Sequence, residues 1–244
     1  MALADYGIDA PKDQQNLMWR GATFLALGLG IFLMNRREYP GPAGAMFGVL
    51  GLIGLVFLAL AAAWYWTSKN GKLKLRDDII GGLNLQGDEK VLDVGCGRGL
   101  LLIGAAKKLK GKGKAFGCDI WTNDLSKNSA DATLANVKAE GVADKCKIES
   151  ADATALPYAE GTFDAVVSAL CVHNIPSPEG REKAVSEIFR VTKPGGKIAI
   201  FDLFRTAEYK SRLSELGARE VVQESLSYGV FPGKLVQARK AEKI

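Results

Sequence analysis

One carboxylate and three glycines lie close together in the stretch VLDVGCGRG, which covers residues 91–99. The apolar residues at its start predict a buried strand, and Gly95, Gly97 and Gly99 predict a sharp turn into the helix-like segment that follows. Backbone without side chains allows a ligand to approach closely, and Asp93 would point at a cationic group of that ligand. The stretch therefore predicts a cofactor site.

Two common nucleotide motifs do not fit this stretch. A dinucleotide-binding GxGxxG motif that begins at Gly95 would need a glycine at position 100, where the chain has Leu100. A P-loop would need Lys-Ser or Lys-Thr after the glycines, and neither pair is present there. The remaining reading is a cofactor that carries a positive charge.

The stretch resembles motif I of the class I S-adenosylmethionine-dependent methyltransferases, with the ubiquinone/menaquinone C-methyltransferase-like branch as the nearest variety. The resemblance implies that S-adenosylmethionine is the cofactor and that Asp93 takes its methionine amino group. Three further matches follow in the family's order: AFGCDI, which ends in Asp119, then ADATALPYAEGTFDAVVSAL and RVTKPGGKIAIFDL. They extend the resemblance over residues 88–240.

The resemblance also implies roles for acids at the carboxyl ends of later strands, where ligands lie in open α/β sheets. Asp119 would accept the ribose hydroxyls, and Asp152, with Ala153 beside it, would contact the exocyclic amine of adenine. Asp152 could instead cap the short helix expected to follow it. The full set of expected cofactor-binding residues is Asp93, Gly95, Cys96, Gly97, Gly99, Asp119, Ile120, Asp152, Ala153 and Ser168.

The expected catalytic residues are His173, Asn174 and Asp202, which follow two strands of the predicted sheet. His173 is the only histidine in the chain, and imidazole can take a proton near neutral pH, so it is a candidate general base. A purely structural hydrogen bond is the competing role for His173. Asn174 could orient the acceptor or cap the next turn, and Asp202 is a second polar group on the acceptor side.

Strand-like and helix-like segments alternate from residue 88 onward, which indicates an α/β fold. We expect a Rossmann-like, seven-stranded, mostly parallel sheet with helices on both faces, in a methyltransferase domain over residues 88–244. The last two strands, 219–227 and 234–239, should form an antiparallel pair around Phe231-Pro232-Gly233. Residues 68–87 should form a basic juxtamembrane linker and a short helix, with the linker either attracted to lipid headgroups or simply solvated.

Two apolar segments precede this domain, and residues 1–67 are therefore expected to form a membrane-anchoring hairpin. Spans of about 17–35 and 42–66 are long enough to cross a bilayer, and the second carries no charge. Lys and Arg near the segment ends favour an orientation with both termini and the catalytic domain in the cytoplasm. A cleaved signal peptide and a buried soluble core are the alternatives.

Small residues recur at helical spacing in both segments, as Ala26 with Gly30 and as Gly44 with Gly48. They could let the two spans pack closely or support a homo-oligomer. The net charge of +5 comes from scattered residues, so we expect no nucleic-acid partner. The four cysteines lack metal-ligand spacing, and we expect free thiols and no metal site.

These features predict a membrane-anchored methyltransferase that acts on a small apolar or lipid-like acceptor, because an anchor would hold the site where such molecules partition. A thiol or metalloid methyltransferase is one alternative, in which Cys146 and Cys171 would matter. A membrane protein that binds S-adenosylmethionine without catalysis is another. Membrane lipids are expected partners in each case.

Overall fold

A computed structural model describes residues 4–121 and 128–242 of the chain. Seven strands form one sheet in the order β3-β2-β1-β4-β5-β7-β6. The first five positions pair in parallel, and β7 and β6 pair antiparallel at one side, which confirms the expected sheet. The strands are β1 (Lys90–Val94), β2 (Lys114–Asp119), β3 (Cys146–Ser150), β4 (Phe163–Ala169), β5 (Thr192–Asp202), β6 (Arg219–Tyr228) and β7 (Phe231–Arg239).

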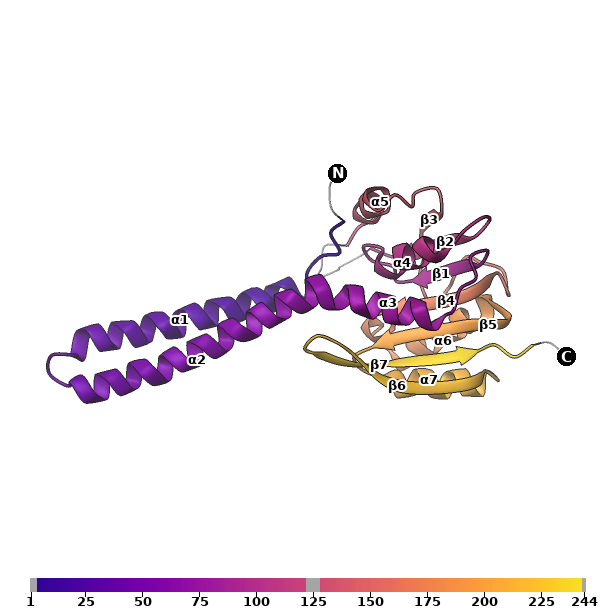
Figure 1. The fold of residues 1–244 in the computed structure, drawn as a ribbon. Helices are drawn as coiled ribbons and strands as arrows, with labels where there is room; N and C mark the ends of the chain where they lie inside the picture. The colour runs from indigo at the N-terminus through magenta and orange to yellow at the C-terminus, as the bar shows by residue number, and fades with distance from the viewer. Residues whose placement is uncertain (1–3, 122–127, 243–244) are drawn as a thin grey trace.

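Helices cover both faces of this sheet because the strands are apolar on both sides. Side chains of α3 (Lys72–Gly82), α4 (Leu100–Lys108) and α5 (Ala130–Ala139) share one buried cluster with β1, β4 and β5. Side chains of α6 (Pro178–Val191) and α7 (Thr206–Glu215) pack in a second cluster on the opposite face. Figure 1 shows the parallel strands pointing toward the side from which two long N-terminal helices project.

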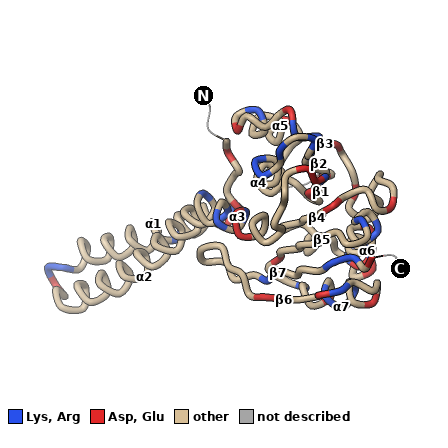
Figure 2. The backbone as a smooth tube through the Cα atoms, turned by 45° about the vertical axis from the view of Figure 1, so that its right-hand side comes forward, with Lys and Arg blue, Asp and Glu red and all other residues tan. Residues whose placement is uncertain are grey.

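Those two helices, α1 (Pro11–Asn35) and α2 (Pro40–Trp66), lie side by side as a hairpin (Figure 1). Both are long and apolar enough to cross a membrane, by length and composition alone. Figure 2 shows charged residues at the hairpin turn and near its base. Between them α2 carries no charge, and α1 carries Arg20 beyond its first turn. The first helix begins six residues earlier than the predicted span, because Pro11 suits the first turn of a helix.

The hairpin helices approach each other at Gly21 and Gly54 rather than at the small residues singled out in the sequence. A Cβ built on Gly21 would lie 2.8 Å from Leu58 Cγ, and one on Gly54 would lie 2.8 Å from Leu25 Cγ. A Cβ on Gly30, Gly44 or Gly48 would meet nothing within 4 Å among the described residues beyond its own helix. Helix packing within the hairpin therefore does not use the Gly44 and Gly48 pair.

The segment after α2 is helical from residue 67 to residue 82, where the sequence predicted a basic linker before a short helix. A short π-helix, η1 (Thr67–Gly71), joins α2 directly to α3. Thr67, Ser68 and Lys72 are buried in this region, so it is not a solvated linker. Its remaining basic side chains pair with neighbouring carboxylates, as Lys69 does with Asp5 at 2.7 Å. The base of the hairpin is thus continuous with the domain.

The antiparallel pair turns earlier than the sequence indicated. Gly229 and Val230 form the connection, and Phe231-Pro232-Gly233 already belongs to β7. Gly229 takes a positive φ of 60°, which suits a tight turn. Pro232 lies near the start of the strand, where its missing N–H does little harm.

Candidate cofactor and acceptor site

The glycine turn after β1 has the close approaches that its sequence suggests. Gly95, Gly97 and Gly99 have φ of 72°, 51° and 86°, a region that favours glycine. A Cβ on Gly95 would lie 2.1 Å from the sulfur of Cys171, which follows β4. The ends of β1 and β4 therefore meet here, and only bare backbone fits between them.

Asp93 lies beneath this turn, at the centre of the sheet. Its side chain is buried, and its Oδ2 accepts a hydrogen bond of 2.8 Å from the backbone N–H of Leu102 in the first turn of α4. Burial raises the pKa of Asp93 from 3.8 to about 7, the Leu102 N–H opposes that rise, and the Asp119 charge adds to it. A cation bound nearby would stabilise the ionised form of this carboxylate.

Asp119 closes the glycine turn from the end of β2. Its Oδ2 accepts from the N–H of Gly97 at 2.8 Å, and its Oδ1 accepts from the N–H of Trp121 at 2.9 Å. The Trp121 indole donates back to the Gly97 carbonyl at 3.3 Å. Asp119, Trp121 and the glycine turn thus form one hydrogen-bonded network. The sequence analysis did not identify Trp121. An aromatic residue two positions after a strand-end acid was the available signal.

Three other expected cofactor residues have different surroundings. Ser168 is fully buried, and its hydroxyl donates to the Val94 carbonyl at 2.9 Å, so it joins β4 to β1. Cys96 is buried, and burial raises the pKa of its thiol. Ile120 is exposed at the end of β2, in reach of a ligand that lies along this edge.

Asp152 and Ala153 follow β3 at the same edge. The Oδ1 of Asp152 accepts from the N–H and the hydroxyl of Thr154, at 2.7 and 2.9 Å. Asp152 therefore caps a turn, where the sequence left open the cap of a short helix. Its side chain is exposed, so a second contact with a ligand is sterically open.

His173 and Asp202 are brought together at the ends of β4 and β5. The Nδ1 of His173 lies 2.5 Å from Asp202 Oδ1, and the His173 backbone N–H donates to Asp202 Oδ2 at 3.1 Å. The Tyr209 hydroxyl from α7 donates to the same Oδ2 at 3.0 Å. Asp202 is fully buried, and burial raises its pKa against the lowering effect of these donors. Asp202 is therefore a partner of His173 rather than a second polar group that faces an acceptor.

This arrangement determines what the imidazole of His173 can do. A carboxylate beside Nδ1 accepts a hydrogen bond from the Nδ1–H group and so keeps the proton on that nitrogen. The Nε2 lone pair is then available to accept a proton. The His173 side chain is 19% exposed, so a ligand can reach it. The sequence analysis did not identify Tyr209, because its role depends on a helix that packs on the sheet from later in the chain.

The turn that carries His173, η2 (Val172–Asn174), is held by polar contacts on both sides. The Asn174 amide donates to the Leu170 carbonyl at 3.1 Å, so its bond runs back to the chain before this turn rather than forward to the next turn, as the sequence had suggested. Leu170 has a φ of 55°, a strained conformation for a residue with a side chain. Buried Arg181 donates at 3.0 Å to the Ile175 and Pro176 carbonyls, which follow this turn.

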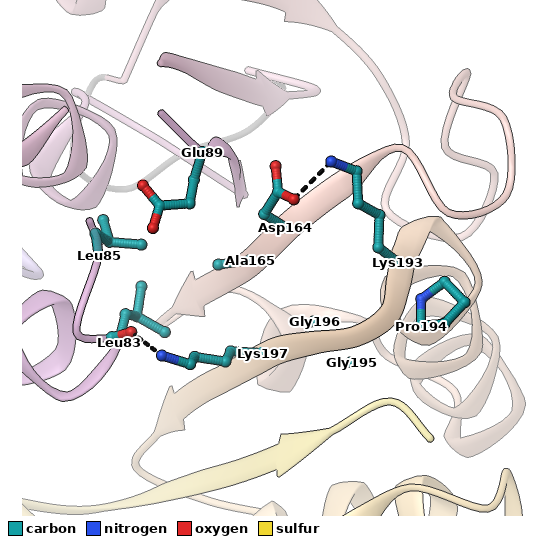
Figure 3. A pocket seen from close by; sticks show the side chains of 10 residues that line it. All are labelled: Leu83, Leu85, Glu89, Asp164, Ala165, Lys193, Pro194, Gly195, Gly196 and Lys197. Carbon is teal, nitrogen blue, oxygen red and sulfur yellow. Dashed lines mark hydrogen bonds and ion pairs between the residues drawn. The ribbon is translucent and has the colours of Figure 1, made fainter. Parts of the chain in front are cut away.

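A recess of about 260 Å³ lies elsewhere, at the amino ends of β4 and β5 (Figure 3). Lys193 and Asp164 form an ion pair of 2.5 Å within it, and Lys197 donates to the Leu83 carbonyl. This recess lies on the opposite edge of the sheet from the glycine turn. It therefore takes no part in the site formed by Asp93, Asp119 and His173.

Comparison with known proteins matches residues 91–196 to the methyltransferase domain family. The chain is 32% identical over 127 residues to sterol 4-C-methyltransferase of Caenorhabditis elegans and 31% identical over 130 residues to demethylmenaquinone methyltransferase of Geobacillus sp. (strain WCH70). These residues form a methyltransferase domain. The matches cover 52% and 53% of this chain but only 35% and 52% of the two relatives.

A solved structure of an S-adenosylmethionine-dependent methyltransferase from Aquifex aeolicus has the same fold. It matches with a TM-score of 0.56 and 22% identity, over 70% of this chain and 93% of that one. The cofactor of this methyltransferase domain is S-adenosylmethionine. The described residues fit such a group, because the positive-φ glycine turn lies at the strand-end edge, with the Asp119 carboxylate bonded to Gly97 and the Asp93 carboxylate beneath the turn.

Proposed function

We propose that this protein is a membrane-anchored methyltransferase that transfers a methyl group from S-adenosylmethionine to a small apolar or lipid-like acceptor. The observation that carries the proposal is the direction of the sheet. The carboxyl ends of the parallel strands, where Asp119 and His173 lie, point toward the side from which the apolar hairpin projects (Figure 1). A site at that edge would face the surface of a bilayer that holds the hairpin.

The strand register supports this direction independently of the view. Asp202 at the end of β5 pairs with Lys234 near the start of β7. Three residues before Lys234, the Phe231 ring packs edge-on against Trp64 in the last turn of α2, with centroids 4.7 Å apart. The acceptor side of the sheet and the base of the hairpin are therefore neighbours.

S-adenosylmethionine supplies an activated methyl on a sulfonium, so the protein has mainly to align the acceptor with it and exclude water. His173, oriented by Asp202, can take the proton that an acceptor hydroxyl, amine or acidic carbon releases as its bond to the methyl forms. The names of the two relatives support an apolar acceptor, since a sterol and a demethylmenaquinone are both lipid-like molecules.

The thiol alternative gains no support from the cysteines. Burial raises the pKa of the Cys171 thiol well above its ordinary value and raises that of Cys146 to about 11. Thiols in such surroundings stay protonated and unreactive near neutral pH. Cys171 instead packs against Gly95, as a small apolar side chain would.

The proposal is tested with the full chain reconstituted in phospholipid vesicles and S-adenosylmethionine labelled in its methyl group. Extracted membrane lipids serve as one acceptor pool, and water-soluble thiols, amines and phenols serve as the other. We expect label in the lipid pool, and a large loss of it with His173→Gln. Label confined to the water-soluble pool would overturn the lipid-like acceptor, and cofactor binding without transfer to any pool would favour the non-catalytic alternative.

A further inference from the structure

The turn between β6 and β7 is locked onto the base of the hairpin. A Cβ on Gly229 would lie 2.1 Å from Thr67 Oγ1, so the turn fits only because residue 229 has no side chain. The Val230 N–H donates to the same Thr67 hydroxyl at 3.2 Å. Together with the contact between Trp64 and Phe231, these interactions join the far end of the sheet to η1.

The N-terminal segment holds the opposite side of the same junction. Lys72 is buried and forms an ion pair of 2.8 Å with Asp9, and its Nζ also donates to the Tyr6 and Gly7 carbonyls. The Trp64 indole donates to the Asp9 carbonyl at 2.8 Å. Because a buried ammonium ion must be paired, Lys72 ties the chain before α1 to the start of α3.

We define the joint as Thr67, Lys72 and Gly229 with their contacts. The helix continues from α2 through η1 into α3, and the joint contacts it from two sides. It is therefore a rigid connection rather than a flexible linker. The orientation of the methyltransferase domain relative to the hairpin then depends on the joint. A single turn of π-helix at this point supports a role in orienting the domain, since such turns within α-helices recur at functional sites.

Two large apolar side chains are exposed at the carboxyl edge of the sheet, on the side of the hairpin. Phe204, two residues after β5, is 65% exposed, and Val230, at the tip of the β6–β7 turn, is 51% exposed. The Phe204 ring lies 6.3 Å from that of His173. We call these two residues the rim.

We propose that the rim rests on the surface of the bilayer and that the joint holds it there, so that a lipid-like acceptor reaches His173 without crossing open water. This inference rests on the proposed membrane anchor. Lipid is the occupant that the structure favours, because Phe204 follows the carboxyl end of β5, the end of the strand on the side of the apolar hairpin, and Val230 is hydrogen-bonded to Thr67 at the base of that hairpin. Exposed apolar residues beside a membrane span gain free energy by contact with lipid.

The test measures the depth of the rim. Phe204→Cys is labelled with the fluorophore NBD in the full chain, and vesicles of equal parts phosphatidylcholine and phosphatidylglycerol carry a nitroxide quencher near the headgroup. Lys112→Cys, exposed at the opposite edge of the sheet, is the matched control. Signal from the chain's own cysteines is subtracted with the unsubstituted protein. We expect several-fold stronger quenching at residue 204 than at residue 112.

Vesicle flotation separates the two proposals. A chain that does not float with the vesicles would overturn both the anchor and the rim. A chain that floats but shows equal quenching at residues 204 and 112 would overturn the rim alone and leave the anchored enzyme standing.

Two glycines give a matched test of the joint. Gly229 and Gly217 both have positive φ, 60° and 81°, but a Cβ on Gly217 would meet nothing within 4 Å among the described residues. Gly229→Ala should abolish the quenching at residue 204, and Gly217→Ala should leave it unchanged. Lys72→Met breaks the joint from its other side and should act like Gly229→Ala. Calorimetric binding of S-adenosylmethionine reports whether each variant is folded, and full quenching in both folded joint variants would overturn the role of the joint.

Discussion

The burial of Asp93 lowers the stability of the folded protein by an amount that depends on pH. Its pKa in the folded protein is about 7, above its ordinary value of 3.8, so the folded state binds more protons than the unfolded state between these values. Stability must therefore fall as the pH rises from about 4 to about 7. A carboxylate kept in such a position is typical of a binding site rather than of a core optimised for stability.

Asp93→Asn should accordingly make the protein more stable at pH 8 in the absence of cofactor. The amide oxygen can still accept from Leu102, while no charge remains buried. The gain should shrink as the pH falls toward 4, because the wild-type carboxyl is then neutral too. Thermal unfolding across this pH range measures the effect. The same variant should bind S-adenosylmethionine at least tenfold more weakly in calorimetry, and unchanged binding would contradict the assigned role of Asp93.

The contacts of Asp202 predict a larger loss of kcat for one substitution than for another. Asp202→Asn removes the carboxylate that orients His173, and we expect kcat to fall by about 10²-fold or more, within the range of general-base effects. Tyr209→Phe removes one hydrogen bond to that carboxylate and should cost on the order of tenfold. The KM for S-adenosylmethionine should stay unchanged in both. A rise in that KM without a fall in kcat would show that this group serves the cofactor rather than the acceptor.

At the scale of elements, the turn after β1 packs directly against the turn after β4. Gly95→Ala would drive a Cβ into the Cys171 sulfur and also strain the backbone at a φ of 72°. We expect a destabilised protein without measurable cofactor binding. The Cys171 Cβ would also lie 2.4 Å from the new Cβ, so Cys171→Gly is needed to relieve the clash. Adding it leaves the backbone strain, so stability should recover in part. Equal melting temperatures for the single and double variants would show that the contact with the Cys171 side chain is unimportant.

The strands and most helices could be predicted from the sequence because their periodicity is local. Phe163–Ala169 is an almost unbroken apolar run, and a sheet covered on both faces requires such a run. The rule that strand ends meet at one edge predicted that Asp119 lies at the same edge as the glycine turn, but its hydrogen bond with the Gly97 N–H was not predicted. Local patterns could not show that Asp202 pairs with Tyr209, or that Ser168 binds Val94, because these contacts depend on packing between distant segments.

The turn at residues 229–230 was misplaced for a related reason. Pro-Gly at 232–233 is a strong turn signal, but a single glycine that fits against Thr67 determines where the chain reverses. The polar segment before Pro11 carries no periodicity at all. Its importance becomes visible only in contacts such as that between the Asp5 N–H and the Asn136 side chain at 2.9 Å.

At the scale of the whole molecule, the N-terminal segment connects the anchor with the cofactor site. Asp5 pairs with Lys69 at the hairpin base, and its carbonyl accepts from Arg98 within the glycine turn at 2.7 Å. The Asn136 amide donates both to Asp5 and to the Arg98 carbonyl, at 2.9 Å in each case. Residues before α1 therefore belong structurally to the methyltransferase domain.

This arrangement changes how a soluble form should be designed. Removing residues 1–67 would delete the contacts of Asp5, Asp9 and Trp64, and it would leave Lys72 buried without its carboxylate partner. Loss of one partner of a buried ion pair costs about 3–5 kcal/mol. We expect this truncation to be poorly stable and to bind S-adenosylmethionine weakly.

Replacing only residues 13–60 with a short Gly/Ser linker should succeed where the truncation fails. The chain ends to be joined lie near each other, since the Asp9 carbonyl accepts from Trp64 across the base of the hairpin. The joint and the N-terminal contacts remain, whereas the apolar shafts are gone. This variant should be soluble without detergent, melt well above the truncated form, and bind S-adenosylmethionine as the full chain does. If both forms bind and melt alike, the N-terminal segment contributes nothing to the domain, and the link from anchor to cofactor site must be abandoned.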